Sequence, residues 1–504
     1  MTARILALGA ALALGACDDT TVTVVTVNAR PAVHGATTLS VEMGNDNATL
    51  TETFDLRGHG FPTSFSITTP TRAGALSLVA TATDEAGIPV ALGSTTATID
   101  PGNRSQASLL LEPADFNVNT QVAGSQRTTW AFGAGARQLV AATDGTFTIA
   151  FSDDCGALVR CDVWGRRFTA NGAPASSAIA AGTAQFNINR TDIFGNDPAL
   201  ALGPTGNLVA VWSTLDNIVC SAIGPDGSIA SATEVILSDG AAPDRPAVAA
   251  LGNRFVVAWQ EQAQGTGAAV IRTRLVDASC QPALNSATGS TAAVTVSSVG
   301  TPDLAAAATA LDGQHAAIVW RSGTAVRGTF MDATGMTNGE QALLEGGSDS
   351  VVWGLELAGI DGGYGLVYGH RSTSASLPDG GFVLRRMGPT GTLLGVETTI
   401  VTPTPDVQSA PAIARRGDGA IGIAWHDCTG ADGSGCAIRA IATTPAGAVV
   451  GTPLVVDTST AGDQTDPSIG ALPDGFAVTW TDGSLAEPDK SETGIRARIV
   501  YPAY

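Results

Sequence analysis

Five side chains that can bind cations or transfer protons recur at one position of a repeated sequence pattern. Each stands two residues after an aromatic residue that ends an apolar segment; they are Asp153, Glu261, His370, Asp427 and Asp482. Two other copies of the pattern carry Thr214 and Ser322 there. Four acids and a histidine on one rim would bind a cation such as Ca²⁺ or a polar ligand such as a glycan. We favour the plainer interpretation that they are solvated loop residues of an acidic protein.

No pattern in the sequence identifies a catalytic site. His-Glu-x-x-His, Gly-x-Ser-x-Gly, a phosphate-binding loop and an EF-hand run are all absent from the sequence. Paired carboxylates that cleave a glycosidic bond stay open as an alternative, because nothing selects a particular pair. We expect no cofactor, with Ca²⁺ as the one ion that the acidic rim would accommodate.

Of the seven cysteines, one lies near the N-terminus and the other six are expected to pair. An even number in an exported chain favours disulfides. Cys155 with Cys161, and Cys428 with Cys436, bracket equivalent loops and are expected to staple hairpins, whereas Cys220 and Cys280 would join neighbouring repeats. A metal site is disfavoured because no nearby histidine and cysteine set completes four ligands.

The seventh cysteine follows an export signal. A positive start through Arg4 is followed by an apolar run, Ile5 to Leu14, that is too short to span a bilayer. The tetrad Leu14-Gly15-Ala16-Cys17 resembles the lipobox of bacterial lipoproteins. That resemblance implies that residues 1–16 are a cleaved signal peptide and that Cys17 carries the lipid, palmitate included. Two or more acyl chains would hold the protein stably on a membrane.

The elements behind this anchor alternate apolar and polar residues. After a tether at residues 17–25, residues 26–112 contain segments such as Leu76-Ser-Leu-Val-Ala-Thr-Ala82, separated by turns such as Asp100-Pro-Gly102. Their number and spacing look like an immunoglobulin-like β-sandwich, although the Cys, Trp, Cys core of antibody domains is missing.

Residues 113–504 repeat one unit. An apolar segment, a turn containing glycine and a strand ending in an aromatic recur, and these aromatics are 47 to 61 residues apart. They are Phe151, Trp212, Trp259, Trp320, Tyr368, Trp425 and Trp480. Asp-Gly pairs before several of these strands indicate tight hairpins, and a third and fourth strand follow. Seven four-stranded units predict a seven-bladed β-propeller.

Closure of the ring is a sharper expectation. The last unit ends after its third strand, whereas Asp115-Phe-Asn-Val-Asn-Thr120 resembles the fourth strands of other units. We expect residues 115–120 to complete the C-terminal blade and remove its open edge. The units also resemble the degenerate tandem repeats of secreted bacterial surface proteins, which implies fold and cell-surface context and no shared chemistry.

Composition agrees with an exported all-β protein. Of 504 residues, 44% are hydrophobic and only 5% aromatic, with 60 glycines and 25 prolines. The net charge of −20 excludes nucleic acid as a partner, and Lys490 is the only lysine. We therefore expect a lipid-anchored, extracytoplasmic cell-envelope protein that binds a protein or glycan without turnover. A propeller hydrolase or lyase acting on extracellular carbohydrate, and a purely structural component, are the alternatives.

Overall fold

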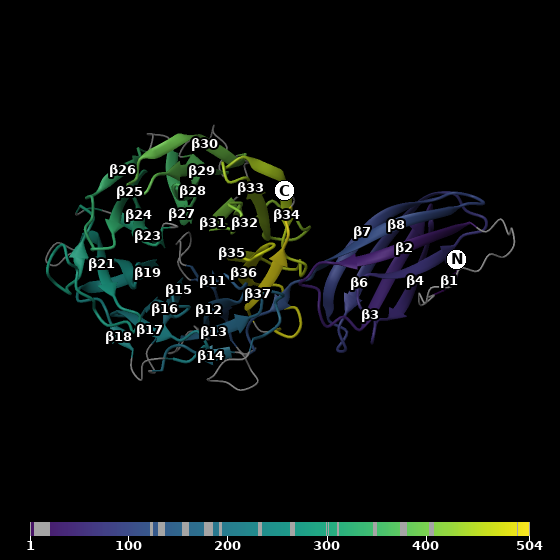
Figure 1. Ribbon diagram of the computed structural model, residues 1–504, viewed down its shortest axis with the longest axis horizontal. Coiled ribbons are helices and arrows are strands. Elements are labelled where there is room, and N and C mark those ends of the chain that lie inside the picture. The colour runs from purple at the N-terminus through teal and green to yellow at the C-terminus, as the bar shows by residue number, and fades with distance from the viewer. Residues whose placement is uncertain are drawn as a thin grey trace. The chain divides into compact units, whose positions relative to one another are not determined.

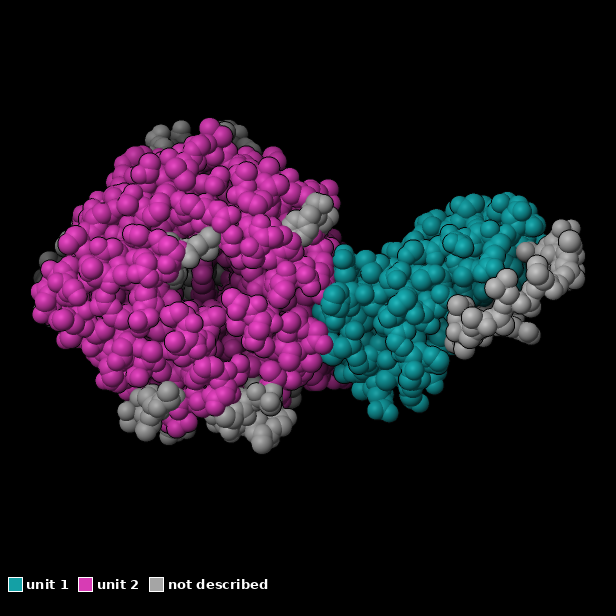
Figure 2. Space-filling view, viewed as in Figure 1, with its two compact units in different colours: residues 1–116 teal, residues 117–504 magenta. Residues whose placement is uncertain are grey.

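The computed structural model divides the chain into two compact units, residues 1–116 and 117–504 (Figures 1 and 2). It describes residues 2–4, 21–120, 124–129, 137–153, 161–175, 185–190, 194–229, 234–262, 268–298, 300, 302–309, 312–345, 350–372, 381–402, 408–490 and 492–502. Within these ranges every regular element is a β-strand. No helix of the described chain is long and apolar enough to cross a membrane.

The first unit forms one curled eight-stranded sheet in the order β1-β5-β2-β8-β7-β6-β3-β4. Its strands are β1 (Thr2–Arg4), β2 (Val22–Ala29), β3 (Thr38–Asn45), β4 (Ala48–Asp55), β5 (Thr63–Thr68), β6 (Gly74–Thr83), β7 (Pro89–Ile99) and β8 (Arg104–Pro113). In β2 and β3 alternate residues are buried, and one apolar core gathers side chains such as Val41, Phe65 and Leu78. Cys17 lies outside the described residues.

The second unit contains seven small sheets within the described residues, arranged in a ring (Figure 1). Blades 1 to 3 comprise β10 (Gln126–Arg127), β11 (Leu139–Ala141), β12 (Phe147–Asp153), β13 (Asp162–Phe168) and β14 (Gln185–Asn187); β15 (Asn196–Leu202), β16 (Leu208–Ser213), β17 (Ile218–Ile223) and β18 (Val235–Ile236); and β19 (Ala241–Leu251), β20 (Arg254–Gln262), β21 (Ala269–Val276) and β22 (Val294–Thr295).

Blades 4 to 6 comprise β23 (Pro302–Thr309), β24 (His315–Ser322), β25 (Ala325–Asp332) and β26 (Gln341–Leu344); β27 (Ser350–Ile360), β28 (Gly363–Ser372), β29 (Phe382–Met387) and β30 (Leu393–Val401); and β31 (Gln408–Arg415), β32 (Ile421–Asp427), β33 (Ala437–Thr443) and β34 (Val449–Val455). Blade 7 comprises β35 (Gln464–Ala471), β36 (Phe476–Asp482), β37 (Gly494–Val500) and β9 (Phe116–Asn117). The seven-bladed propeller and its closure by the segment around Phe116 are thus confirmed.

The blades hold together because each sheet is apolar on both faces. In β20, Phe255, Val257 and Trp259 pack against blade 2, while Val256 and Ala258 pack against blade 4. All seven repeat aromatics are at most 1% exposed. Since burial contributes roughly 25 cal/mol per Å² of apolar surface, neighbouring blades stabilise one another.

Candidate functional site

The five residues predicted to form a rim do not face open solvent where the structure describes their side chains. Asp153, Glu261, Asp427 and Asp482 are 3%, 4%, 1% and 4% exposed. The expectation of solvated loops is wrong for these four, because the second strand of their blades continues two residues past the aromatic and keeps them inside the sheet. The side chain of His370 lies outside the described residues. A ligand role for the set stays a prediction.

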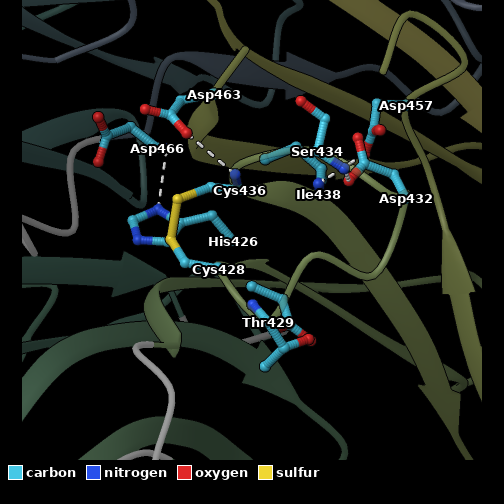
Figure 3. Close-up of a disulfide and its surroundings, with 11 residues drawn as sticks. His426, Cys428, Thr429, Asp432, Ser434, Cys436, Ile438, Asp457, Asp463 and Asp466 are labelled. Carbon is cyan, nitrogen blue, oxygen red and sulfur yellow. Dashed lines mark hydrogen bonds between the residues drawn. A yellow bond between two sulfur atoms is a disulfide. The ribbon is translucent and has the colours of Figure 1, made fainter. Parts of the chain in front are cut away.

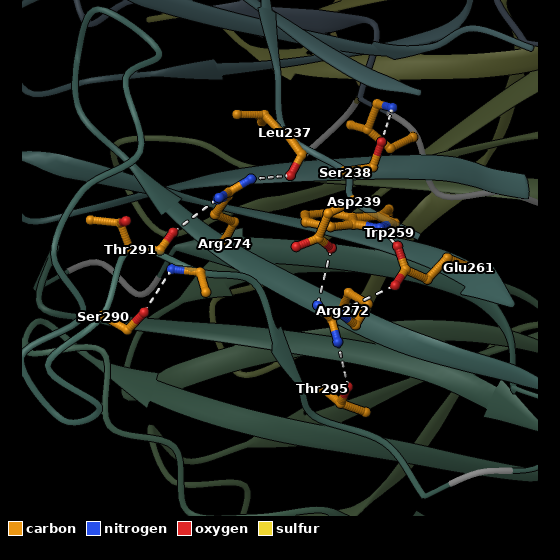
Figure 4. A network of polar contacts seen from close by, with 12 residues as sticks. Leu237, Ser238, Asp239, Trp259, Glu261, Arg272, Arg274, Ser290, Thr291 and Thr295 are labelled. Atoms are coloured by element: carbon orange, nitrogen blue, oxygen red, sulfur yellow. Dashed lines mark hydrogen bonds and ion pairs between the residues drawn. The ribbon is translucent and has the colours of Figure 1, made fainter. Parts of the chain in front are cut away.

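Neighbouring side chains donate hydrogen bonds to the carboxylates of these residues or form ion pairs with them. The indole Nε1–H of Trp259 donates to Glu261 at 2.7 Å, and the Nε of Arg272 lies 3.3 Å from the same carboxylate (Figure 4). Arg439 pairs with Asp427 at 3.1 Å. The amide groups of glutamines on the first strands reach the other two acids: Gln126 donates to Asp153 at 2.7 Å and Gln464 to Asp482 at 3.2 Å. These contacts tie the strands of a blade together.

Two disulfides predicted from spacing are present. Cys220 on β17 bonds Cys280 beyond β21, with Cα atoms 5.8 Å apart, and so joins blades 2 and 3. Cys428 bonds Cys436 across the loop between β32 and β33 (Figure 3). Cys161 is also disulfide-bonded, whereas Cys155 lies outside the described residues.

A repeated backbone irregularity marks one end of the first strands, which lie innermost in the ring (Figure 1). The pairing register shifts in several of these strands, and the residue at the shift takes a positive φ immediately before a proline: Asp197 (50°), Arg245 (53°), Ala410 (48°) and Asp466 (51°). Such a bulge re-aims the side chain it carries. Aspartate tolerates the left-handed region better than most residues, and the strain concentrates at functional sites.

The bulges of blades 2 and 7 bring two acids near each other, with blade 1 between them. The hydroxyl of Thr129 donates to Asp197 at 2.7 Å, and the adjacent Thr128 donates to the backbone oxygen of Asp466 at 2.9 Å. From blade 6, the Nδ1 atom of His426 accepts a hydrogen bond of 3.4 Å from the backbone N–H of Asp466 (Figure 3). We call Thr129, Asp197, His426 and Asp466 the channel-mouth cluster.

Burial sets the protonation of this cluster. Asp197 and Asp466 are 4% and 7% exposed. Loss of solvation raises the pKa of Asp466 to about 6, and the negative charge of Asp197 adds to that shift, while Thr465 and Arg127 oppose it. Burial also lowers the pKa of His426 to about 4, so the imidazole is neutral at neutral pH. The Oδ1 atom of Asp466 is buried without a hydrogen-bond partner.

Farther along the first strands, a cavity of about 500 Å³ lies within the ring, which Figure 2 shows hollowed at its middle. Its walls are formed by β11, β15, β19, β27, β31 and β35, together with the turns after them. Arg137 of blade 1 reaches blade 5, where its Nε lies 3.4 Å from Glu356 and its Nη2 donates to the backbone oxygen of Leu357. Since blades 1 and 5 are not neighbours, this pair crosses the ring.

Burial also controls the charge of Glu356. The carboxyl is buried and its pKa is raised to about 7 by loss of solvation, although Arg137 acts in the opposite direction. Among the described residues, no group of three or more histidines, cysteines or acids is arranged to hold a metal ion.

Sequence reasoning did not single out Asp197, Asp466 or Glu356. A signal for the first two existed: Asn196-Asp197-Pro198 and Thr465-Asp466-Pro467 align with Asp244-Arg245-Pro246 and Ser409-Ala410-Pro411. Glu356 stands out only after alignment of the strands, because Ala199, Ala247 and Ala412 occupy the equivalent place.

Comparison with known proteins gives general likeness only. No protein-family model and no curated protein sequence matches the chain. Among solved structures, a Dyadobacter fermentans protein of unknown function has 11% identity and a TM-score of 0.41, covering 63% of this chain and 97% of its own. The α-L-arabinofuranosidase Arb93A from Fusarium graminearum has 10% identity and a TM-score of 0.38, covering 77% and 98%. An endo-arabinase from Bacteroides thetaiotaomicron has 14% identity and a TM-score of 0.33, covering 61% and 94%. Likeness at this level says nothing about shared activity.

Proposed function

We propose that the protein is an exported, lipid-anchored hydrolase that cleaves a glycosidic bond of an extracellular carbohydrate at the channel-mouth cluster. The observation that carries this proposal is that Asp197, which accepts a hydrogen bond from Thr129, is near enough for its negative charge to raise the pKa of Asp466, whose Oδ1 is buried without a partner. Two carboxyl groups in different environments are what acid–base cleavage of a glycoside requires.

The two acids take different roles. Asp466, with its pKa near 6, keeps a proton at mildly acidic pH and donates it to the glycosidic oxygen. Asp197 accepts a proton from a water molecule, whose oxygen forms the new bond to the anomeric carbon as the bond to the leaving oxygen breaks. Asp197 then loses its proton to solvent and Asp466 regains one. The neutral His426 holds the Asp466 backbone and adds no competing positive charge.

Activity screening with matched variants tests this. The purified protein is incubated with a panel of 4-nitrophenyl glycosides and polysaccharides near pH 6, and reducing ends and nitrophenol are measured. We expect Asp466→Asn and Asp197→Asn each to lower kcat at least a hundredfold, the lower range of general acid–base catalysis. Asp226→Asn, at an exposed turn, serves as the control. Turnover that survives both cluster variants would show that the reaction occurs elsewhere.

Binding without turnover is the second candidate, and the burial of both acids favours it, since a substrate must reach side chains that are at most 7% exposed. Isothermal titration with the same polysaccharides separates the two. Saturable binding that Asp466→Asn weakens, with no product formed, would replace hydrolysis with recognition. Absence of both binding and turnover would leave the structural role.

The anchor and the first unit belong to the same proposal. The tetrad ending at Cys17 supports lipid attachment at the cell envelope. The first unit, which keeps strands β2 to β8 once β1 is removed with the signal peptide, would act as an immunoglobulin-like spacer. Growth with an alkyne palmitate analogue tests the anchor. We expect label on the wild-type protein and on Asp18→Asn and none on Cys17→Ser; label on Cys17→Ser would place the lipid elsewhere.

A further inference from the structure

The central cavity differs in chemistry from the channel-mouth cluster. Asp466 and Gly470 are four residues apart on β35, which is roughly 13 Å of extended strand. Gly470 lines the cavity, whereas Asp466 does not. The cavity is therefore a separate place in the ring, and what it binds does not depend on the hydrolysis proposed above.

Aliphatic side chains form most of its described wall, and about a third of the described lining residues are alanines. The alanines that line it are Ala141, Ala142, Ala201, Ala249, Ala250, Ala358, Ala414 and Ala471. No aromatic side chain occurs among the described lining residues, and Thr143 is the one hydroxyl. Sugars are recognised by stacking and by converging polar groups, so this wall does not suit them. It suits a ligand with a compact aliphatic body.

The charged groups in the wall have one sign. Arg137 and Arg415 line the cavity, and no acidic side chain occurs among the described lining residues, although the chain as a whole carries a net charge of −20. Asp361, which pairs with Arg415 through Nη2 at 2.8 Å, is half exposed, and the Nε of Arg415 is buried without a hydrogen-bond partner. Guanidinium groups bind carboxylates through their N–H donors, so an arginine with an unpartnered Nε–H beside apolar walls suits a carboxylate ligand.

We propose that the central cavity binds a small aliphatic monocarboxylate, whose carboxylate meets Arg415 and Arg137 and whose hydrocarbon part lies against the alanine wall. Glu356 supports this arrangement because its pKa near 7 keeps part of the population neutral, which leaves the charge of Arg137 available to the ligand. The cavity volume of about 500 Å³ falls within the range of small-molecule sites.

Titration calorimetry near pH 6.5 tests the proposal with sodium hexanoate as the probe, and 1-hexanol and sodium acetate as comparisons. Hexanoate should bind saturably. Acetate lacks the aliphatic body and 1-hexanol lacks the charge, so each should bind about tenfold more weakly or worse. Arg415→Met keeps the aliphatic stem and removes the charge, and should weaken hexanoate binding by about tenfold or more.

Two further variants complete the experiment. Ala250→Leu, on β19 and away from both arginines in sequence, fills the cavity and should weaken hexanoate binding, while Arg104→Met, exposed in the first unit, should not change it. Fluorescence and thermal unfolding confirm that each variant is folded. Absence of saturable hexanoate binding, equal binding of 1-hexanol, or full affinity in both Arg415→Met and Ala250→Leu would each overturn the proposal.

Discussion

The backbone N–H of Ile495 donates to the Oδ1 atom of Asn119 at 2.9 Å across 376 residues of sequence. The amide of the same side chain donates to Asp489 at 2.7 Å and to Gln126 at 3.1 Å. Asn119 is 1% exposed, so these bonds form out of contact with water. One asparagine thus links the segment after β9 to β10 through Gln126, to β37 through Ile495 and to the loop before β37 through Asp489.

Loss of that link should open the ring. We expect Asn119→Ala to lower the free energy of unfolding by about 2–4 kcal/mol, because buried donors and acceptors on three partners lose their bonds. The eight tryptophans all lie after residue 117, so denaturation followed by tryptophan fluorescence reports the propeller alone. Asn103→Ala, at an exposed turn of the first unit, should leave that transition unchanged. An unaltered transition in Asn119→Ala would mean that closure rests on β9 alone.

The two observed disulfides should contribute differently to the free energy of unfolding. Cys220–Cys280 closes 60 residues and Cys428–Cys436 closes eight, and the chain-entropy relation gives about 4 and about 2.5 kcal/mol for loops of these lengths. Unfolding of Cys220→Ala/Cys280→Ala should therefore occur at lower denaturant than unfolding of Cys428→Ala/Cys436→Ala. The reverse order would show that the longer bridge adds little to packing between blades 2 and 3.

We expect Glu261 to stabilise its blade rather than to bind a ligand. Glu261→Ala would leave the indole N–H of Trp259 and the guanidinium of Arg272 without their shared acceptor (Figure 4). We expect a loss of about 2–4 kcal/mol in unfolding free energy. Glu345→Ala, whose pair with Arg327 is largely exposed, should cost under about 1 kcal/mol. Equal small losses in both variants would return Glu261 to the candidate ligands.

The sequence predicted the propeller because its signal is repeated. Apolar strands ending in Trp259, Trp425 or Trp480 recur at similar spacing, so the clear copies of the repeat identify the weaker ones. A pattern based on the shared residues does not reveal the candidate site, because Asp197, Asp466 and Glu356 depart from the repeat. Other blades carry Arg245, Ala410 or alanine at these positions. The departures that give a blade its chemistry become visible only when the bulge register is known.

Burial was the other quantity that sequence could not supply. Asp153 and Asp427 follow an aromatic by two residues, a place where the chain was expected to enter a loop. The strand instead continues, and a glutamine amide donates to Asp153 while an arginine pairs with Asp427. Whether a strand ends at the aromatic or two residues later depends on the partner strands on either side. Gln126 lies on β10, which pairs with the strand of Asp153, and Arg439 lies on β33, which pairs with the strand of Asp427.

Glu356 should make the propeller less stable as the pH rises. Its pKa in the folded protein is about 7, above its ordinary value of 4.5, so folding favours the protonated form. The stabilisation is complete below pH 4.5 and is lost as the pH rises through 7, at no more than about 1.4 kcal/mol per pH unit.

Glu356→Gln mimics the protonated form and lacks this titration. The unfolding free energy of Glu356→Gln relative to wild type should therefore rise between pH 4.5 and 7 and then level off, as measured by denaturation with tryptophan fluorescence. Glu85→Gln, exposed in the first unit, should show no such difference. A flat difference for Glu356→Gln across this range would mean that Arg137 compensates the buried charge in full.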